Sequence, residues 1–416
     1  SNFSVQNSTF SFNYDDQSQD GGVLNIRLWS SGGDVLISGN EFYQNYGDDI
    51  ASYECIGLTI TDNIFYSDHN NFDNQAMYMR YVKPLIISNN TLTGRSYIRV
   101  NHDCFGIIEK NMIQHNTNYT HGIYVSQSNM EITSNVISNC RDGVYYESNR
   151  NFSENDTYQH LINYNTIYNT FEASLELRNN SQDIEISNNT LVNADKDNNN
   201  GSDGAAVYFY NNSSDFFTHS NVVTNSRYGG YFDNNSGSFE FYNNNFWNNE
   251  NLFSGSGYPT DLGTVTSQNI NGDPSDIYSN IYLDPEFVEP DSNDYSLLST
   301  SPLIDAGYIL FVDPDGTIRD IGAHYFDHGN PHNLILEDVD DQEVTLHWST
   351  VNRDSLTGYN VYSKLTTETD YTLSVSTTDT TAIVSNLTNN IDYNFVATSV
   401  YPNSESINSI SVTGRP

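Results

Sequence analysis

The sequence contains few basic residues. Lysine and arginine together number 15, aspartate and glutamate number 53, and the formal net charge is −38. A protein that tracks nucleic-acid phosphates needs a basic surface, so this charge excludes nucleic acid as a partner. The same charge argues against electrostatic docking on an anionic membrane. It suits a solvated extracellular surface or a saline habitat.

Long apolar segments are also missing. No apolar run approaches the roughly 20 residues of a membrane-spanning helix. No basic segment followed by an apolar one opens the chain, so we expect residue 1 to follow a processing boundary. Aromatic residues make up 13% of the sequence, whereas disordered chains contain few of them. We therefore expect a folded, soluble protein without membrane insertion.

Cysteine is scarce as well. Cys55, Cys104 and Cys140 cannot form a disulfide framework in a chain of 416 residues. Two of them could pair, but small buried apolar side chains are the favoured interpretation. No Cys-x-x-Cys spacing occurs, which argues against a structural zinc site.

A short phrase centred on asparagine recurs along the first part of the chain. Clear copies are ISGNEF from Ile37, ITDNIF from Ile60, ISNNTL from Ile87 and ITSNVI from Ile132. In nearly every copy an apolar residue stands three positions before the asparagine and another two positions after it. This alternation predicts a strand, a bend and a second strand. The aligned asparagines are Asn40, Asn63, Asn90, Asn111, Asn135, Asn165, Asn189, Asn221 and Asn244.

The spacing of the repeat indicates its architecture. Asn40 and Asn244 lie 204 residues apart over eight intervals, which gives a mean period of 25.5. Such a period, with several short strands per copy, resembles the right-handed parallel β-helix family. In that family a recurring asparagine forms an internal ladder, in which stacked side-chain amides hydrogen-bond one coil to the next. Asparagine also tolerates a left-handed bend, and its amide can satisfy the backbone of a turn.

The repeat decays after about residue 255. DPEFV from Asp284, DYSL from Asp294, SPLIDAG from Ser301 and DIGAHY from Asp320 resemble the closing segment of many secreted bacterial β-helix proteins. We therefore expect β-helix repeats over residues 1–255 and a closing segment over residues 256–330.

The composition changes again from Pro331, toward threonine, serine and valine in alternating strands. An early tryptophan, and Leu387 followed six residues later by Tyr393, resemble a fibronectin type III domain with its tyrosine corner. The predicted fold is all-β, with a right-handed parallel β-helix followed by a fibronectin type III-like β-sandwich over residues 331–416.

Strands that precede the repeated phrases place aromatic and arginine side chains on one outward flank, because side chains alternate along a strand. Aromatic faces suit sugar rings, and arginine forks suit carboxylates or sulfates. We therefore predict an elongated groove that binds an anionic polysaccharide. The alternative is that these side chains only pair adjacent coils. The first predicted column holds Arg27, Tyr78, Arg99, Tyr124, Tyr145, Glu176 and Tyr208, and the second holds Trp29, Tyr53, Arg80, Asn101, Glu147, Arg178 and Tyr210.

The resemblance to polysaccharide lyases of this shape implies a set of catalytic groups. Such lyases neutralise a uronate carboxylate and then abstract the adjacent proton. On this resemblance, Arg80 and Arg99 would bind the carboxylate, and Tyr124 or His121 would act as the base. The calcium carboxylate cluster and catalytic lysine of several such families have no clear counterpart on the flank. Whether the chain is an enzyme stays open.

Hydrolysis is the second possible activity. Hydrolases of this shape use paired carboxylates, and Glu147 with Glu176 form the one pair found on adjacent coils. Both side chains could equally be solvated strand residues. Neither reaction requires a cofactor.

A calcium loop is a further candidate site. Asp313, Asp315 and Asp320 in DPDGTIRD resemble an oxygen-ligand loop, with Gly316 at the sharp turn. The insertion between Asp195 and Asp203 is a second candidate. An acidic turn without an ion is the alternative for both.

The order of the domains resembles that of proteins exported by the bacterial type IX pathway, which implies a secreted or cell-surface location. The leading hypothesis is recognition, with or without cleavage, of an anionic polysaccharide. The alternative is an adhesin or extracellular filament subunit. Strand-like sequence starts at residue 1 without a polar cap, and open strand edges can pair with another chain.

Overall fold

The computed structural model describes residues 3–13, 22–27, 34–68, 75–115, 118, 120–147, 160–179, 181–195, 204–211, 214–233, 238–349, 351, 356–402 and 404–416. The chain divides into two compact units, Ser1–Tyr308 with Asp320–His324 and Ile309–Arg319 with Tyr325–Pro416. Residues 309–319 and 325–330, which the sequence places in the closing segment, group with the second unit. Among the described residues, no helix has the length and apolar character needed to cross a bilayer.

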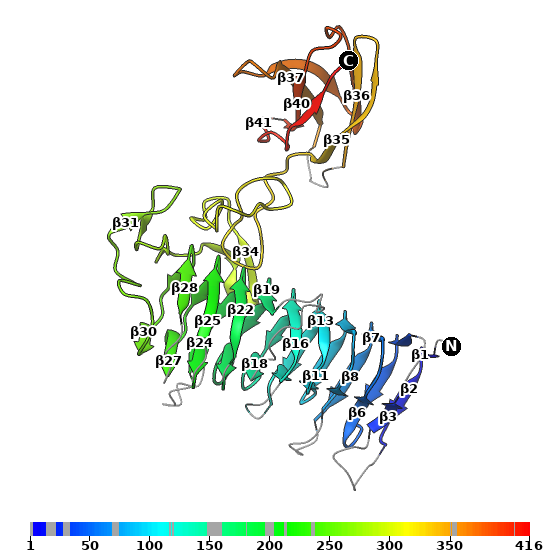
Figure 1. Cartoon of the computed structure of the whole chain (residues 1–416), viewed down its shortest axis with the longest axis vertical. Coiled ribbons are helices and arrows are strands. Elements are labelled where there is room, and N and C mark those ends of the chain that lie inside the picture. Colours follow the sequence, from blue (N-terminus) through cyan, green and yellow to red (C-terminus); the bar gives the residue numbers. More distant parts are fainter. Residues whose placement is uncertain are drawn as a thin grey trace. The chain divides into compact units, whose positions relative to one another are not determined.

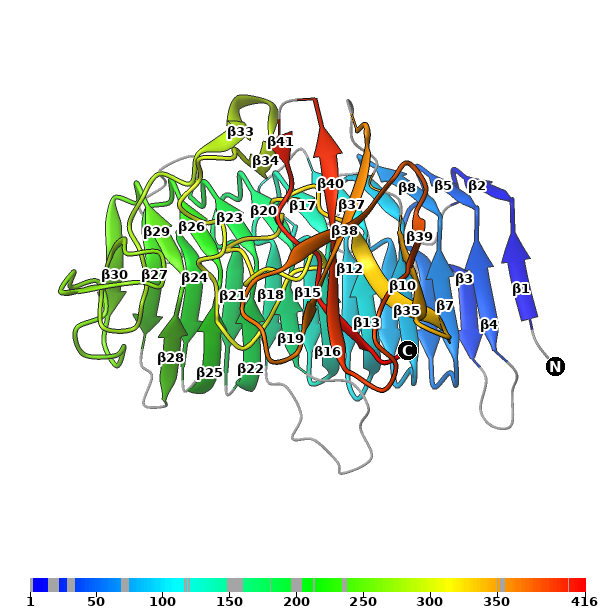
Figure 2. The ribbon, with the colours of Figure 1, turned by 90° about the horizontal axis from the view of Figure 1, so that it is seen from above.

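The first unit winds into stacked coils, and each coil adds one strand to each of three parallel sheets (Figure 1 and Figure 2). Sheet 1 consists of β1 (Phe3–Gln6), β4 (Val35–Ser38), β7 (Leu58–Thr61), β10 (Leu85–Ser88), β13 (Phe105–Glu109), β16 (Asn129–Thr133), β19 (Leu161–Asn163), β22 (Gln182–Ser187), β25 (Ser214–His219) and β28 (Phe239–Tyr242). Sheet 2 consists of β2 (Thr9–Ser11), β5 (Glu41–Tyr43), β8 (Ile64–Ser67), β11 (Thr91–Gly94), β14 (Met112–His115), β17 (Val136–Ser138), β20 (Thr166–Tyr168), β23 (Thr190–Val192), β26 (Val222–Thr224) and β29 (Asn245–Trp247). Sheet 3 consists of β3 (Gly22–Arg27), β6 (Asp48–Tyr53), β9 (Met77–Arg80), β12 (Ile98–Asn101), β15 (Ile123–Ser126), β18 (Val144–Glu147), β21 (Leu175–Arg178), β24 (Ala205–Tyr210), β27 (Tyr228–Asp233) and β30 (Asn251–Gly255).

The predicted asparagine ladder is confirmed at the bend between sheets 1 and 2. Asn111 is representative: its Oδ1 accepts hydrogen bonds from the backbone N and the Nδ2 of Asn90, each at 3.0 Å. Its own Nδ2 donates to the carbonyl oxygens of Ile87 and Glu109, also at 3.0 Å. The residue before each asparagine takes the left-handed bend, with φ of 54° at Lys110. Each amide therefore closes its own bend and binds the next coil.

The ladder extends beyond the repeated phrase. The backbone N and the Nδ2 of Asn244 donate to Oδ1 of Asn280 at 2.9 and 3.0 Å. The buried Asp276 then ends the ladder, because its Oδ1 accepts from the backbone N of Asn280 at 3.0 Å and its Oδ2 from the Tyr282 hydroxyl at 2.7 Å. A carboxylate only accepts, so it satisfies these donors without presenting a further amide. The long interval of 36 residues hid this rung in the sequence.

The apolar positions beside the ladder fill the inside of the coils. The rings of Phe10, Phe42 and Phe65 stack at centroid distances of 5.0 and 4.8 Å, and aliphatic residues such as Leu92 and Ile113 are buried at the same position of later coils. Parallel strands stack about 4.8 Å apart, which lets identical positions pack in register. The three cysteines are free and buried, as predicted.

The closing segment docks on the turns that carry the ladder. It contains β31 (Ser267–Gln268), β32 (Pro274–Ser275), β33 (Phe287–Glu289), the 3-10 helix η1 (Pro290–Ser292) and β34 (Asp294–Leu297). Nδ2 of Asn188 donates to the carbonyl oxygens of Asp320 and Gly322 at 2.9 and 3.2 Å. Gly322 has φ of 113°, and a Cβ there would lie 3.0 Å from Cγ2 of Val222. The glycine of DIGAHY is therefore required by a close approach to the coils.

The second unit contains a β-sandwich built from β35 (His332–Asp340), β36 (Glu343–Ser349), β37 (Gly358–Leu365), β38 (Thr372–Thr377), β39 (Thr381–Val384), β40 (Tyr393–Tyr401), β41 (Ser404–Glu405) and β42 (Val412–Gly414). Strands β35, β36 and β39 form one sheet, and β38, β37, β40, β41 and β42 form the other. Trp348 is fully buried between them. The Tyr393 hydroxyl accepts a hydrogen bond from the backbone N of Thr388 at 3.1 Å, as a tyrosine corner requires.

The ladder should determine the stability of the first unit. In Asn135→Ala, the backbone N of Asn111 loses its acceptor, and the carbonyl oxygens of Ile108 and Thr133 lose their donor. We expect the free energy of unfolding to fall by more than about 3 kcal/mol, because each unsatisfied buried group costs about 1–3 kcal/mol. Urea unfolding of Asn135→Ala beside the exposed control Asn248→Ala measures this. Equal stabilities of the two variants would contradict the role of the ladder.

Candidate functional site

The outward side chains of sheet 3 form two columns on a single flank, which we call the tyrosine–arginine face. Strand pairing fixes the members of each column. The first holds Ala51, Tyr78, Arg99, Tyr124, Tyr145, Glu176, Tyr208 and Tyr231. The second holds Arg27, Tyr53, Arg80, Asn101, Ser126, Glu147, Arg178, Tyr210 and Asp233.

One predicted column position is wrong. Arg27 pairs with Tyr53, so it belongs to the second column, and Asn25 takes the first-column position beside Ala51. Both side chains still point outward, because residues two positions apart on a strand such as β3 lie on the same face. Trp29 lies outside the described residues.

Three arginines of this face lie against tyrosine rings. The guanidinium carbon of Arg99 lies 5.3 Å from the ring centre of Tyr78 and 5.1 Å from that of Tyr124. Arg80 lies 5.9 Å from the Tyr53 ring, and Arg27 lies 4.8 Å from the same ring. Within the described part of the chain, none of the three arginines forms an ion pair with a carboxylate. Their positive charges are therefore available to an external anion.

The later coils of the face are neutralised internally. Nε of Arg178 pairs with Oε1 of Glu176, and its guanidinium lies 4.6 Å from the ring centre of Tyr210. The rings of Tyr124 and Tyr145 stack at 4.9 Å with an interplanar angle of 8°. Two parallel rings of this kind present a flat surface, whereas the free positive charge is confined to the earlier coils.

Two predicted contributors to the first column point outward but are not exposed, and Asn101 of the second column is also buried. Glu176 is fully buried, and Tyr208 is 1% exposed. Tyr208 packs with Ala173 and Ala205, against Tyr231. Strand parity gives the direction of a side chain but not its coverage by neighbours, so these two residues contribute to the packing beneath the face.

Tyr124 and His121 lie together, as the lyase prediction requires, with ring centres 5.5 Å apart. The Tyr124 hydroxyl donates to Oε2 of Glu147 at 2.9 Å, and burial together with this carboxylate raises the pKa of Tyr124 to about 12. Burial, with Arg141 nearby, lowers the pKa of His121 to about 4. At neutral pH Tyr124 therefore keeps its proton, and His121 is neutral. Their predicted roles as bases stay predictions.

The two carboxylates of the hydrolase alternative lie on adjacent coils and in different columns, as predicted. Glu147 pairs along the sheet with Arg178, and its Oε1 accepts a hydrogen bond from Nδ2 of Asn179 at 2.6 Å. Glu176 belongs to the other column and instead approaches Asp142 and Glu172.

Asp142, Glu172 and Glu176 form an acidic cluster that the sequence reasoning missed. Their carboxylate oxygens all lie within 4.8 Å of one another, and Asp142 and Glu176 are fully buried. Burial raises the pKa of both buried carboxyl groups. The charge of Glu172 raises the pKa of Asp142 further, and the charge of Asp142 raises that of Glu176. Arg141 pairs with Glu172 at 2.8 Å, and His121 Nδ1 lies 2.9 Å from Oδ2 of Asp142.

This cluster is the one group of three potential metal ligands in the described part of the chain. Its all-oxygen donor set is of the kind that Ca²⁺ takes. The guanidiniums of Arg141 and Arg178 already pair with the cluster, and two carboxylates this close share a proton readily.

Asp142 lies in the turn before β18, and Glu172 in the turn before β21. An alignment of these turns, rather than of the strands alone, could have found the cluster.

The predicted calcium loop does not appear as such a group. In the second unit, Oδ1 of Asp315 accepts hydrogen bonds from the backbone N and the hydroxyl of Thr317 at 3.1 and 2.8 Å. In the first unit, Oδ1 of Asp320 accepts from the backbone N of Asp305 at 2.7 Å. Asp313 is buried as well. The calcium loop therefore stays a prediction. In the insertion from Asp195 to Asp203, residues 196–203 lie outside the described residues.

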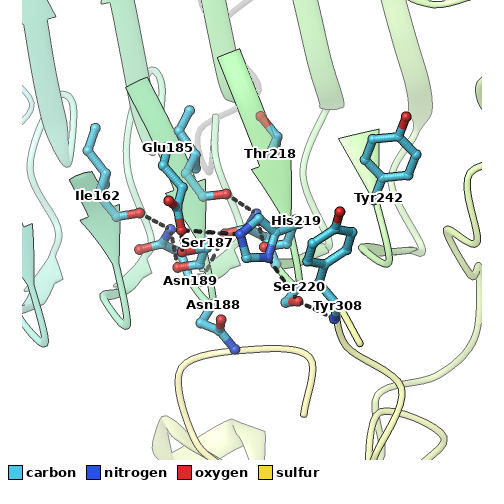
Figure 3. Close-up of polar contacts among 12 residues, drawn as sticks. Ile162, Glu185, Ser187, Asn188, Asn189, Thr218, His219, Ser220, Tyr242 and Tyr308 are labelled. Atoms are coloured by element: carbon cyan, nitrogen blue, oxygen red, sulfur yellow. Dashed lines mark hydrogen bonds and ion pairs between the residues drawn. The ribbon is translucent and has the colours of Figure 1, made fainter. Parts of the chain in front are cut away.

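Figure 3 shows a Glu–His–Ser contact beside the ladder. Nε2 of His219 lies 3.2 Å from Oε1 of Glu185, and its Nδ1 lies 3.2 Å from Oγ of Ser220. A carboxylate, an imidazole and a hydroxyl follow one another in this contact, as they do in a catalytic triad with a serine nucleophile. However, Ser220 is fully buried, and its Oγ accepts a hydrogen bond from the backbone N of Tyr308 at 2.9 Å. The contact therefore holds the closing segment on the coils and offers no substrate access.

Comparison with known families agrees with the two units. Residues 1–160 match the family model described as "Right handed beta helix region", and residues 329–415 match "Fibronectin type III domain". No curated protein matches the chain at a significant level.

Similar solved structures cover about a fifth of the chain. "Titin kinase and its flanking domains" is 24% identical over 20% of this chain and 16% of that chain, with a TM-score of 0.19. The twitchin kinase region from C. elegans is 17% identical over 20% and 15%, with a TM-score of 0.19. An Fn3-like protein from Clostridium thermocellum is 21% identical over 20% and 88%, with a TM-score of 0.19. The chain thus spans less than a fifth of the twitchin and titin structures.

The acidic cluster predicts a pH-dependent stability. The pKa values of Asp142 and Glu176 are raised above the ordinary 3.8 and 4.5, so above this range the folded protein binds more protons than the unfolded chain. The free energy of unfolding should therefore fall as the pH rises. Glu176→Gln should flatten this dependence by about 1–3 kcal/mol between about pH 5 and about pH 8, whereas the exposed control Glu240→Gln should not. Urea unfolding at several pH values measures the slope. A slope for Glu176→Gln equal to that of the unaltered protein would contradict the shared proton.

Proposed function

We propose that this protein binds an anionic polysaccharide along the tyrosine–arginine face. One observation carries the proposal: in a chain of net charge −38, Arg27, Arg80 and Arg99 lie on tyrosine rings without a carboxylate partner among the described residues. Unpaired guanidiniums bind carboxylates and sulfates through two parallel hydrogen bonds. Tyrosine rings supply flat apolar surfaces for the sugars between these charges.

The dimensions of the face suit a chain-like ligand. Six coil intervals separate Tyr53 from Tyr210 along the second column, and each interval rises about 4.8 Å. Potential contacts therefore extend over roughly 30 Å in one direction. A polysaccharide that lies parallel to the β-helix axis can use many of them at once, whereas a small ligand can use few.

The proposal is for binding rather than elimination. A lyase needs an unprotonated base that can reach the substrate. Tyr124 has a raised pKa and donates its proton to Glu147, and Nδ1 of His121 lies against the buried Asp142 carboxylate. A secreted or cell-surface location belongs to the same proposal, because extracellular glycans are the ligands that such a face suits. Ca²⁺ is not required by it.

Self-association through the first coil is a second candidate function. On the first described coil, Phe12 is 72% exposed, and a cavity of about 230 Å³ is lined by Phe3, Val5, Leu24 and Ile26. Sedimentation velocity over a wide concentration range separates the two functions, since an adhesin or filament subunit would form larger species without glycan.

Loss of the unpaired arginines should weaken glycan binding. For Arg80→Gln/Arg99→Gln we expect affinity for dextran sulfate or alginate to fall at least about tenfold, because two charge-assisted contacts are removed. Isothermal titration calorimetry measures this, with neutral dextran as the control ligand. The matched variant Arg415→Gln removes an arginine that is already paired with Asp392, and it should bind as the unaltered protein does.

Two results would count against the proposal: equal affinities of the double variant and the unaltered protein, or no binding of any anionic glycan. An unsaturated uronate product, detected by its ultraviolet absorbance during incubation with alginate, would restore the lyase alternative.

A further inference from the structure

His102 lies at the edge of the tyrosine–arginine face, directly after β12. Its φ is 52°, and its backbone N donates to the carbonyl oxygen of Ser126 at 3.0 Å, so its position in the turn is fixed. The neighbouring coil supplies Tyr81, whose ring centre lies 6.0 Å from the imidazole. The turn thus holds a histidine beside the two central arginines of the face.

Two nitrogen atoms at this place are buried and have no hydrogen-bond partner among the residues that the structure describes. They are Nε of Arg80 and Nδ1 of His102. Buried nitrogen atoms without a partner cost free energy, and native structures contain few of them. Both the guanidinium and a protonated imidazole are donors to oxyanions. Their unused donor capacity points to an anionic ligand.

Arg99 approaches the same place from the next coil. In the amide orientation that satisfies Asn101, its side-chain oxygen accepts a hydrogen bond from Nε of Arg99 at 3.1 Å. Asn101 is the strand partner of Arg80 and the residue before His102. Asn101 therefore fixes the guanidinium of Arg99 toward Arg80 and His102.

The carboxylates near His102 do not neutralise this group. Asp103, the next residue, pairs with Lys83. Glu54 occupies the equivalent turn position two coils earlier, with Tyr81 between it and His102, and it is exposed. The positive charges that face the imidazole are those of Arg80 and Arg99, and together with burial they lower the pKa of His102.

We infer that Arg80, Arg99 and His102 form a subsite for a sulfate ester of the glycan. This inference rests on the proposed function and names the chemical class of the ligand. A carboxylate offers two oxygens, which a single guanidinium satisfies through its fork. A sulfate ester offers three terminal oxygens, which match donors from three side chains on different strands and turns.

The sulfate subsite has a consequence for pH dependence. In the free protein His102 is neutral at neutral pH, because its pKa is lowered from 6.5. A bound sulfate favours the charged imidazole, so binding takes up a proton. Affinity for a sulfated glycan should therefore increase as the pH falls toward the ordinary value of histidine and decrease as it rises.

Two glycans with one backbone test this inference. Chondroitin sulfate and unsulfated chondroitin carry the same uronate, and they differ in the sulfate ester. By calorimetry at about pH 5.5 and about pH 8, the unaltered protein should prefer chondroitin sulfate at least about tenfold at the lower pH and less at the higher pH. His102→Gln should lose both this preference and its pH dependence while still binding chondroitin. His347→Gln, a histidine of the second unit, is the matched control.

A second variant tests the subsite independently of His102, in case His102→Gln fails to fold. Arg80→Lys keeps the charge but removes Nε and the fork, so its affinity should fall more for chondroitin sulfate than for unsulfated chondroitin. Thermal unfolding of all variants establishes that they are folded.

The outcomes separate the two proposals. Equal affinities of the unaltered protein for the two glycans, or an unchanged preference in His102→Gln, would overturn the sulfate subsite and leave the proposed function standing. No binding of either chondroitin would overturn the sulfate subsite, and no binding of alginate or dextran sulfate as well would overturn both proposals.

Discussion

The hydrogen bond from one asparagine side chain to the next is the interaction on which the structure depends. Ten asparagines from Asn40 to Asn280 repeat it, and Asp276 ends the series. Each rung fixes a left-handed bend and sets the register of one coil on the next. Because the register is fixed at the bend, all three sheets stack position on position. The tyrosine–arginine face is a consequence of that register. From Tyr78 to Tyr208, neighbouring members of its first column are separated by 21 to 32 residues in sequence, and only the stacking of the coils brings them together.

The sequence predicted those parts of the structure that local chemistry determines. Asparagine at a fixed interval gave the ladder, and alternation gave the outward set on sheet 3. Arg27 was assigned to the wrong column because the length of the connection between strands sets the register of one coil on the next, and the repeated phrase does not specify that length. Glu176 and Tyr208 were expected to be exposed because strand parity carries no information about the side chains that cover a position.

The acidic cluster could not be predicted from strands alone. Asp142 and Glu172 lie 30 residues apart in turns, and only the stacking of coils brings their carboxylates together. The same holds for the group of Arg80, Arg99 and His102, which combines two strands and a turn. Residue types pointed to chemistry on this flank, whereas the three-dimensional contacts decided which charges are paired.

The pairing of arginines divides the first unit into two parts. Arg141 and Arg227 each pair with a carboxylate, as Arg178 does with Glu176, so they stabilise the later coils. Arg80 and Arg99 have only tyrosine rings and an amide as described partners. In so acidic a chain, this difference is the strongest argument that the earlier coils meet an external anion.

The central claim is that the unpaired arginines, and not the paired ones, contact the ligand. Nuclear magnetic resonance of the arginine Nε–Hε groups during titration with a sulfated glycan tests it directly. The resonances of Arg80 and Arg99 should shift until the protein is saturated with glycan, while those of Arg141 and Arg227 stay in place. Shifts confined to the paired arginines, or no shift at Arg80 and Arg99 while the glycan binds, would contradict the account.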